Sequence, residues 1–152
     1  MSRSKPPSAS KPGSSNRSPP DIFCDRSLGR RKVPDRLRQV HPVVIAHDDV
    51  FPQDTDDEVW LREAGRRGWI VVMKDDRIRY RPGERKMVIE AGVCCFCLHP
   101  SKDMTGEDMA TTLVLALPRI LRHHASHPEG GYIQGVNRQG RLRALFPKPT
   151  LG

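Results

Sequence analysis

Four acidic residues stand where their carboxylates could converge on one place. Asp25 and Asp75 each come at the end of a short apolar run that is typical of a buried strand. The carboxyl ends of parallel strands meet at one edge of a sheet, where α/β proteins form their functional crevice. Asp57 and Glu84 each stand in the expected first turn of a helix, on the face that carries its apolar residues. We therefore expect these four carboxylates to gather near one sheet edge.

Carboxylates gathered in this way repel one another and need a counter-charge. Two acids about 5 Å apart repel by roughly 3 kcal/mol at an effective dielectric constant of about 20. Protonation, arginine or a divalent cation would each relieve this repulsion. Oxygen ligands suit Mg²⁺ or Mn²⁺, and such metals can activate water and stabilise charge on a phosphodiester. The pattern predicts a Mg²⁺ or Mn²⁺ site held by Asp25, Asp57 and Asp75, with Glu84 as a further catalytic acid.

The sequence leaves the identity of the fourth acid open among Glu84, Asp56 and Asp76. A purely structural interpretation also exists for each acid. Acids that end strands are common, and acids at helix N-termini are stabilised by the helix dipole. That interpretation is preferable for any one residue alone, whereas the four together favour a site.

Arginines flank the acidic positions on both sides. The six that we expect to line the crevice are Arg26, Arg30, Arg31, Arg77, Arg79 and Arg81. Guanidinium groups in these positions could bind the phosphate backbone of a nucleic acid without entering a metal site. Acids at the centre and bases at the rim are typical of a metal-dependent nuclease.

The overall charge agrees with a polyanionic partner. The chain of 152 residues has 26 Lys and Arg against 18 Asp and Glu, a formal charge of +8. Residues 1–20 hold four of the bases and no acid, and their Pro- and Ser-rich composition predicts a disordered basic tail. We expect one folded domain over residues 21–147 and a frayed C-terminus over 148–152. No secretory signal and no apolar run of 18 residues is visible, which predicts a cytoplasmic protein with no membrane partner.

The order of apolar and amphipathic segments predicts an α/β fold. Apolar runs at residues 22–24, 43–46, 70–73 and 93–98 read as parallel strands that are buried on both faces. Helices are expected between them, one of which should begin at Thr55 with a capping box to Glu58.

The second half of the chain holds a further helix and two β-like segments. A long apolar helix should follow Thr105, and Pro118 should kink or divide it. The two β-like halves around residues 137–140 predict a hairpin or an edge appendage.

Other residues that could do chemistry favour structural roles. His123 and His127 have a spacing that could bind zinc, but their place at a helix end favours an interaction with the helix dipole. Trp60 and Trp69 could stack on bases, although their apolar neighbours favour packing in the core. Four cysteines lie in apolar runs and are predicted to be buried free thiols: Cys24, Cys94, Cys95 and Cys97.

Three stretches of the sequence resemble a known family. FCDRSLG at the end of the first strand, TDDEVWLREAGRRGWIVVMKDDRIR in the middle, and a following helix that opens with Glu84 look like the PIN-like nuclease domains. The likeness is strongest to the compact VapC-type ribonuclease toxins. It covers about residues 21–121 and leaves out the N-terminal tail and the C-terminal hairpin.

The resemblance implies a three-layer α/β/α fold with a central, mainly parallel sheet of four or five strands. It implies a Mg²⁺- or Mn²⁺-dependent endoribonuclease that is the toxin of a type II toxin-antitoxin pair, with an RNA substrate, a cognate antitoxin and a homodimer as partners. The family's acids would be Asp25, Asp57 and Asp75, with Glu84 as the fourth. The alternative is a catalytically inactive PIN-like module that binds RNA or protein.

Overall fold

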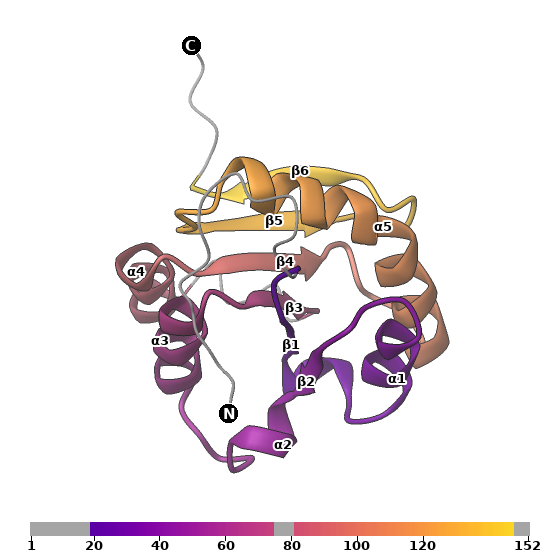
Figure 1. The fold of residues 1–152 in the computed structure, drawn as a ribbon, viewed down its shortest axis with the longest axis horizontal. Coiled ribbons are helices and arrows are strands. Elements are labelled where there is room, and N and C mark those ends of the chain that lie inside the picture. The colour runs from indigo at the N-terminus through magenta and orange to yellow at the C-terminus, as the bar shows by residue number, and fades with distance from the viewer. Residues whose placement is uncertain (1–18, 75–80, 148–152) are drawn as a thin grey trace.

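Short strands alternate with helices along the computed structural model, which describes residues 19–74 and 81–147 (Figure 1). The strands are β1 (Ile22–Cys24), β2 (Val44–Ala46), β3 (Ile70–Met73), β4 (Cys94–Leu98), β5 (Tyr132–Val136) and β6 (Leu142–Phe146). The helices are the 3₁₀ turn η1 (Arg26–Leu28), α1 (Lys32–Arg38), α2 (His47–Val50), α3 (Asp57–Arg67), α4 (Pro82–Ala91) and α5 (Gly106–Ser126). The four predicted parallel strands are thus present, with bounds that differ by at most one residue.

All six strands belong to one sheet in the order β2-β1-β3-β4-β5-β6. Neighbours from β2 to β5 pair in parallel, and β6 pairs antiparallel with β5. The predicted number of four or five strands is therefore too low. The C-terminal hairpin is not an appendage, because β5 pairs with β4 along its whole length and extends the central sheet.

Helices cover both faces of the sheet, which gives the predicted three layers (Figure 1). Helices α1 and α5 pack on one face, where alternate strand residues such as Ile22 and Phe96 meet Leu37 and Leu113. Helices α3 and α4 pack on the other face, where Phe23 lies in the same core cluster as the α3 and α4 side chains. Burial on both faces explains why the central strands are continuously apolar.

The start of α3 differs from the prediction. Helix α3 begins at Asp57, with Asp56 in the extended N-cap conformation and no side-chain cap hydrogen bond, so the expected capping box of Thr55 and Glu58 does not form. Thr55 instead donates its backbone N–H to the carbonyl of Pro52 in a turn. Glu58 is left with an exposed side chain.

Helix α5 runs unbroken through Pro118, so of the two predicted effects of this proline, a kink or a division of the helix, the division is wrong. Its apolar stripe, which includes Leu113, Ala116 and Ile120, is buried against the sheet and stabilises the helix on both sides of the proline. The helix begins after Thr105 as predicted, and here a capping box does form, with Asp108.

The burial of the cysteines can be compared directly with the prediction. All four lie among the described residues and are buried thiols outside any disulfide, as predicted. Within residues 19–74 and 81–147, no helix combines the length and the apolar character that crossing a membrane requires.

Candidate active site

Asp25 ends β1 with its side chain turned into the protein, and the residue is only 6% exposed. It is the N-cap of η1, and one carboxylate oxygen accepts a hydrogen bond of 3.1 Å from the backbone N–H of Ser27. The Ser27 hydroxyl in turn accepts the backbone N–H of Lys74 at 3.2 Å. These contacts fix the carboxyl ends of β1 and β3 relative to each other.

Asp57 is the first residue of α3 and shares its face with buried Trp60, as the helical spacing predicted. The indole Nε1–H of Trp60 donates a hydrogen bond of 2.9 Å to Asp57 Oδ1. Arg26 Nη2 lies 3.4 Å from the same oxygen, and Arg81 Nη1 lies 3.4 Å from Oδ2. The Asp57 carboxylate is therefore oriented from the core and neutralised from the solvent side.

Glu84 reaches the same place from the first turn of α4. One of its oxygens, Oε2, lies 3.2 Å from Arg81 Nη1. The other, Oε1, is buried and has no hydrogen-bond partner among the described residues. A buried carboxylate oxygen without a partner is costly, so this atom favours a proton or a cation beside it.

The pKa shifts show that these acids affect one another. Burial raises the pKa of Asp25, the hydrogen bonds from Ser27 oppose this, and the charge of Asp57 raises it further. Burial is also the largest cause of the raised pKa of Glu84. The charge of Asp57 raises this pKa further, while Arg81 lowers it. Asp57 thus lies within electrostatic reach of both Asp25 and Glu84.

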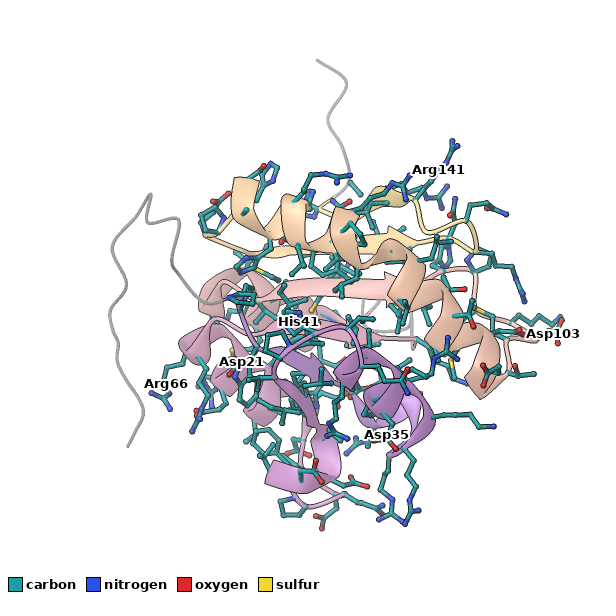
Figure 2. The ribbon with its side chains drawn as sticks, turned by 45° about the vertical axis from the view of Figure 1, so that its right-hand side comes forward. Asp21, Asp35, His41, Arg66, Asp103 and Arg141 are labelled. Carbon is teal, nitrogen blue, oxygen red and sulfur yellow. The ribbon has the colours of Figure 1, made fainter. Side chains whose placement is uncertain are left out.

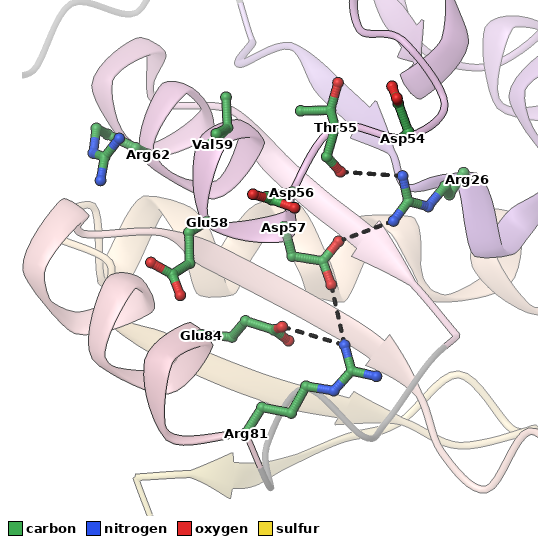
Figure 3. Close-up of a pocket in the computed structure, with 10 residues that line it drawn as sticks. All are labelled: Arg26, Asp54, Thr55, Asp56, Asp57, Glu58, Val59, Arg62, Arg81 and Glu84. Atoms are coloured by element: carbon green, nitrogen blue, oxygen red, sulfur yellow. Dashed lines mark hydrogen bonds and ion pairs between the residues drawn. The ribbon is translucent and has the colours of Figure 1, made fainter.

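A cavity of about 480 Å³ opens beside Asp57 and Glu84, and Asp25 is not among its lining residues. Figure 3 shows Asp57 at its centre, between the guanidinium groups of Arg26 and Arg81, with Glu84 next to Arg81. The lining residues are mostly charged: Arg26, Asp54, Thr55, Asp56, Asp57, Glu58, Val59, Arg62, Arg81 and Glu84. The cavity therefore suits a charged and hydrated ligand better than an apolar one.

Close packing of α3 on α4 brings Asp57 and Glu84 to the same cavity. Gly65 of α3 lies against the backbone of Ala91 of α4, where a Cβ atom on Gly65 would stand only 2.1 Å from the carbonyl oxygen of Ala91. Only glycine permits this approach. The two helices start at neighbouring points because they cross at a residue that has no side chain.

The donor set fits a hard divalent cation in its chemistry, since Asp25, Asp57 and Glu84 offer only carboxylate oxygens. The unpartnered Oε1 of Glu84 supplies a free ligand atom. In the part of the chain that the structure describes, however, no three Asp, Glu, His or Cys side chains stand close enough to surround one ion. Arg26 and Arg81 hold the carboxylates that a cation would neutralise.

The remaining predicted residues fall into two groups. Asp75, Asp76, Arg77 and Arg79 lie outside the described residues, so they can be placed only by sequence. Arg30 and Arg31 are described, but neither lines the cavity. Arg30 instead lies 3.5 Å from Asp48, and Arg31 is the N-cap residue of α1.

Sequence reasoning missed three groups that support the acids. Ser27 and the indole N–H of Trp60 donate to Asp25 and Asp57 respectively. His47 is buried at 1% exposure, and it lies within electrostatic reach of Asp25. The spacings Asp25 to Ser27 and Asp57 to Trp60 are the signals that could have found the first two, because they match an Asx turn and a helical i, i+3 pair.

Comparison with known proteins agrees with this geometry. The sequence matches the family described as "PIN like domain" over residues 20–100. Among curated proteins, it is 31% identical over 128 residues to "Putative ribonuclease VapC45" of Mycobacterium tuberculosis, which covers 82% of this chain and 91% of that protein. No solved structure matches the chain significantly. The chain therefore belongs to the PIN-like domain family, as a member of its VapC type.

Proposed function

We propose that the protein is a Mg²⁺- or Mn²⁺-dependent endoribonuclease and the toxin of a type II toxin-antitoxin pair. The observation that carries the proposal is the convergence of Asp57 and Glu84, from two helices, on a charged cavity rimmed by Arg26 and Arg81. Asp25 adds a third carboxylate within electrostatic reach of Asp57. We include Asp75 in this set because of its position in the sequence, directly after Lys74 and two residues beyond the end of β3.

In this proposal the chain's own groups orient and neutralise an RNA phosphodiester. Asp57, held by Trp60, and Asp25, held by Ser27, are carboxylates of fixed orientation that can share a cation. When Mg²⁺ or Mn²⁺ is bound, it supplies activation of the attacking water and stabilisation of charge on the phosphate. Glu84 has a raised pKa and is suited to accept the proton of that water.

Arg26 and Arg81 have a second role in the same proposal. Their guanidinium groups pair with Asp57 and Glu84 in the structure, at 3.2 to 3.4 Å. Once a cation neutralises the acids, the arginine N–H groups can donate to phosphate oxygens instead, for which their planar geometry is suited. In the absence of metal and RNA, Arg26 and Arg81 thus supply the positive charge that neutralises the carboxylates.

The toxin role rests on the likeness to the M. tuberculosis relative, which is named as a VapC ribonuclease. Inducible expression of the chain in a bacterial host should arrest growth, and co-expression of the small protein encoded beside its gene should restore it. Growth that is unaffected by the wild-type chain would contradict the toxin role. RNA cleavage by the purified protein is a separate result and tests the nuclease role.

The metal should stabilise the protein in a pH-dependent way. The pKa values of Asp25 and Glu84 are raised on folding, so between the ordinary and the raised pKa the folded state binds more protons than the unfolded state. The free energy of unfolding therefore falls as the pH rises through this range. A cation relieves that loss, and at about 100 times its Kd it adds about 2.7 kcal/mol.

We therefore expect Mn²⁺ to raise the melting temperature by roughly 5 to 10 °C at neutral pH and much less at acidic pH, where Asp25 and Glu84, whose pKa values are raised, take up protons that compete with the cation. Thermal unfolding with and without Mn²⁺ across this pH range measures the effect. An equal Mn²⁺ shift at both ends of the range would show that the cation binds elsewhere.

Trp60→Phe should weaken cation binding without removing a ligand. Phenylalanine keeps an aromatic ring in the core but lacks the N–H that orients Asp57 Oδ1. Loss of such a supporting hydrogen bond costs about 10- to 100-fold in metal affinity. Calorimetric titration with Mn²⁺ measures this change.

Trp69→Phe is the matched control, since Trp69 is also buried and stacks on Phe23 with ring centroids 5.0 Å apart. Among the described residues, Trp69 forms no hydrogen bond with Asp57. Equal Mn²⁺ affinities in the two variants would show that the Trp60 N–H does not act on the site.

A further inference from the structure

A second group of basic side chains lies at the C-terminal hairpin, beyond the residues that match the PIN-like family. Its members are Lys102, which follows β4, Arg119 of α5, and Arg138 and Arg141 of the turn between β5 and β6. All four are exposed. We call these four residues the hairpin basic surface.

Contacts between the hairpin and α5 hold this surface together. Arg119 Nη1 donates to the carbonyl oxygen of Gly140 at 3.4 Å, and Arg138 Nη2 donates to the carbonyl oxygen of Lys102 at 3.4 Å. The turn itself is fixed by Asn137, whose side chain accepts the backbone N–H of Arg141 at 2.9 Å. Gly140 packs directly on α5, since a Cβ atom there would lie 3.3 Å from the backbone of Ala116.

The positive charge of this surface is only partly compensated. Arg119, Arg138 and Arg141 form no ion pair with any carboxylate in residues 19–74 and 81–147. The pKa of Asp108 is lowered chiefly by the hydrogen bond from the Thr105 backbone N–H in the capping box, and the nearby charge of Arg138 adds a smaller effect. Each guanidinium has five N–H donors, and one hydrogen bond to a carbonyl leaves most of them available.

The surface lies at the same edge of the sheet as the candidate active site. Strands β1, β3, β4 and β5 are parallel, so Arg26 after β1, Lys102 after β4 and Arg138 after β5 all follow carboxyl ends. Three strand spacings separate β1 from β5, which is roughly 14 Å. Figure 2 places Arg141 and Asp103 beyond this end of the sheet.

We propose that the hairpin basic surface binds the backbone of single-stranded RNA on one side of the cleavage site, so that the strand runs along the carboxyl edge from Arg26 and Arg81 to Arg138 and Arg141. The inference deepens the proposed function and rests on it for the position of the scissile bond. The charge of the surface, its free N–H donors and its alignment with the cavity all fit a chain of phosphates. A single phosphodiester unit cannot bridge the distance, so the surface acts only on longer substrates.

The test compares Arg138→Ala/Arg141→Ala with wild type in binding a labelled single-stranded oligoribonucleotide, measured by fluorescence anisotropy in EDTA over a range of salt concentrations. The double variant should bind roughly tenfold more weakly at low salt. Its slope of log K against log salt should be smaller by about 1.4, since about 0.7 is lost for each phosphate contact. Its melting temperature should match that of wild type, because both side chains are exposed.

Arg66→Ala/Lys86→Ala is the matched control. It removes the same formal charge from the exposed surfaces of α3 and α4, on the other face of the sheet. The control should keep the wild-type slope. In cleavage assays the hairpin variant should raise KM for the long RNA and leave both kcat and the cleavage of a short oligonucleotide unchanged.

Equal salt slopes for the hairpin variant and wild type would overturn the inference, whether or not the protein cleaves RNA. An equal loss of affinity in the control variant would also overturn it, because net charge alone would then explain the effect. If the slope changes as expected but the wild-type protein cleaves nothing, the hairpin surface is supported and the proposed nuclease function fails.

Discussion

Asp57→Asn is expected to lower RNA cleavage by about a thousandfold or more and to abolish the Mn²⁺-induced rise in melting temperature. Asp57 is the acid that the other groups surround, with Trp60, Arg26 and Arg81 all in contact with its carboxylate. Asparagine keeps the shape and can still accept from Trp60, but it removes the charge that attracts a cation. A loss of several kcal/mol of transition-state stabilisation corresponds to a rate loss of this size.

Asp35→Asn is the control for this substitution. Asp35 also stands in the first turn of a helix, but its exposed carboxylate lies 2.8 Å from Arg38 and does not line the cavity. Its substitution should change neither cleavage nor the Mn²⁺ response. Asp75→Asn is expected to behave like Asp57→Asn on the basis of its sequence position. An Asp57→Asn protein that cleaves RNA as fast as wild type would remove Asp57 from the site.

Gly65→Ala is expected to destabilise the protein by about 3 kcal/mol, although the same change in an exposed helix usually stabilises by up to about 1 kcal/mol. The new methyl group would stand 2.1 Å from the Ala91 carbonyl oxygen and 2.7 Å from its Cβ, so α3 and α4 must separate. For a chain of this size the melting temperature should fall by roughly 6 to 12 °C. Cleavage should fall as well, because Asp57 and Glu84 begin the helices that move.

Gly83→Ala tests whether the loss comes from this contact. Gly83 is also helical, and a Cβ atom there would meet only Oε2 at the end of the Glu58 side chain, at 2.7 Å. That side chain is exposed and can rotate away, so Gly83→Ala should change stability by less than about 1 kcal/mol in either direction. Similar melting temperatures for the Gly65→Ala and Gly83→Ala proteins would contradict the role given to the α3–α4 contact.

Strong periodic signals were enough to predict the central elements. The strands β1, β3 and β4 are short, continuously apolar runs, and buried parallel strands have that pattern. Gly68 and Gly92 end α3 and α4, where both adopt the left-handed conformation that glycine favours.

Features that depend on tertiary contacts were predicted less well. The sequence TDDE matches a capping box, yet Thr55 is held in a turn and Arg26 donates to its carbonyl oxygen, so Asp56 becomes the N-cap. Pro118 failed to divide α5 because burial of the apolar stripe outweighs the lost hydrogen bond. The place of the hairpin in the main sheet depends on pairing with β4, which a local pattern cannot show.

The sequence predicted the grouping of the acids but not the groups that contact them. Strand ends and helix faces indicated that Asp25, Asp57 and Glu84 would lie near one another, and the pKa shifts place Asp57 within electrostatic reach of the other two. The rim was only partly correct. Arg26 and Arg81 reach Asp57, whereas Arg30 pairs with Asp48, because the direction of a loop side chain depends on the fold around it.

The most direct test of the central claim is cleavage of a defined RNA by the purified protein, stripped of metal and then resupplied. We expect no cleavage in EDTA, full recovery when Mg²⁺ or Mn²⁺ is added in excess, and no recovery by the Asp57→Asn protein under the same conditions. Cleavage that persists in EDTA would contradict a metal-dependent nuclease site at these carboxylates. Recovery of cleavage by the Asp57→Asn protein to the wild-type level when metal is added would contradict it too.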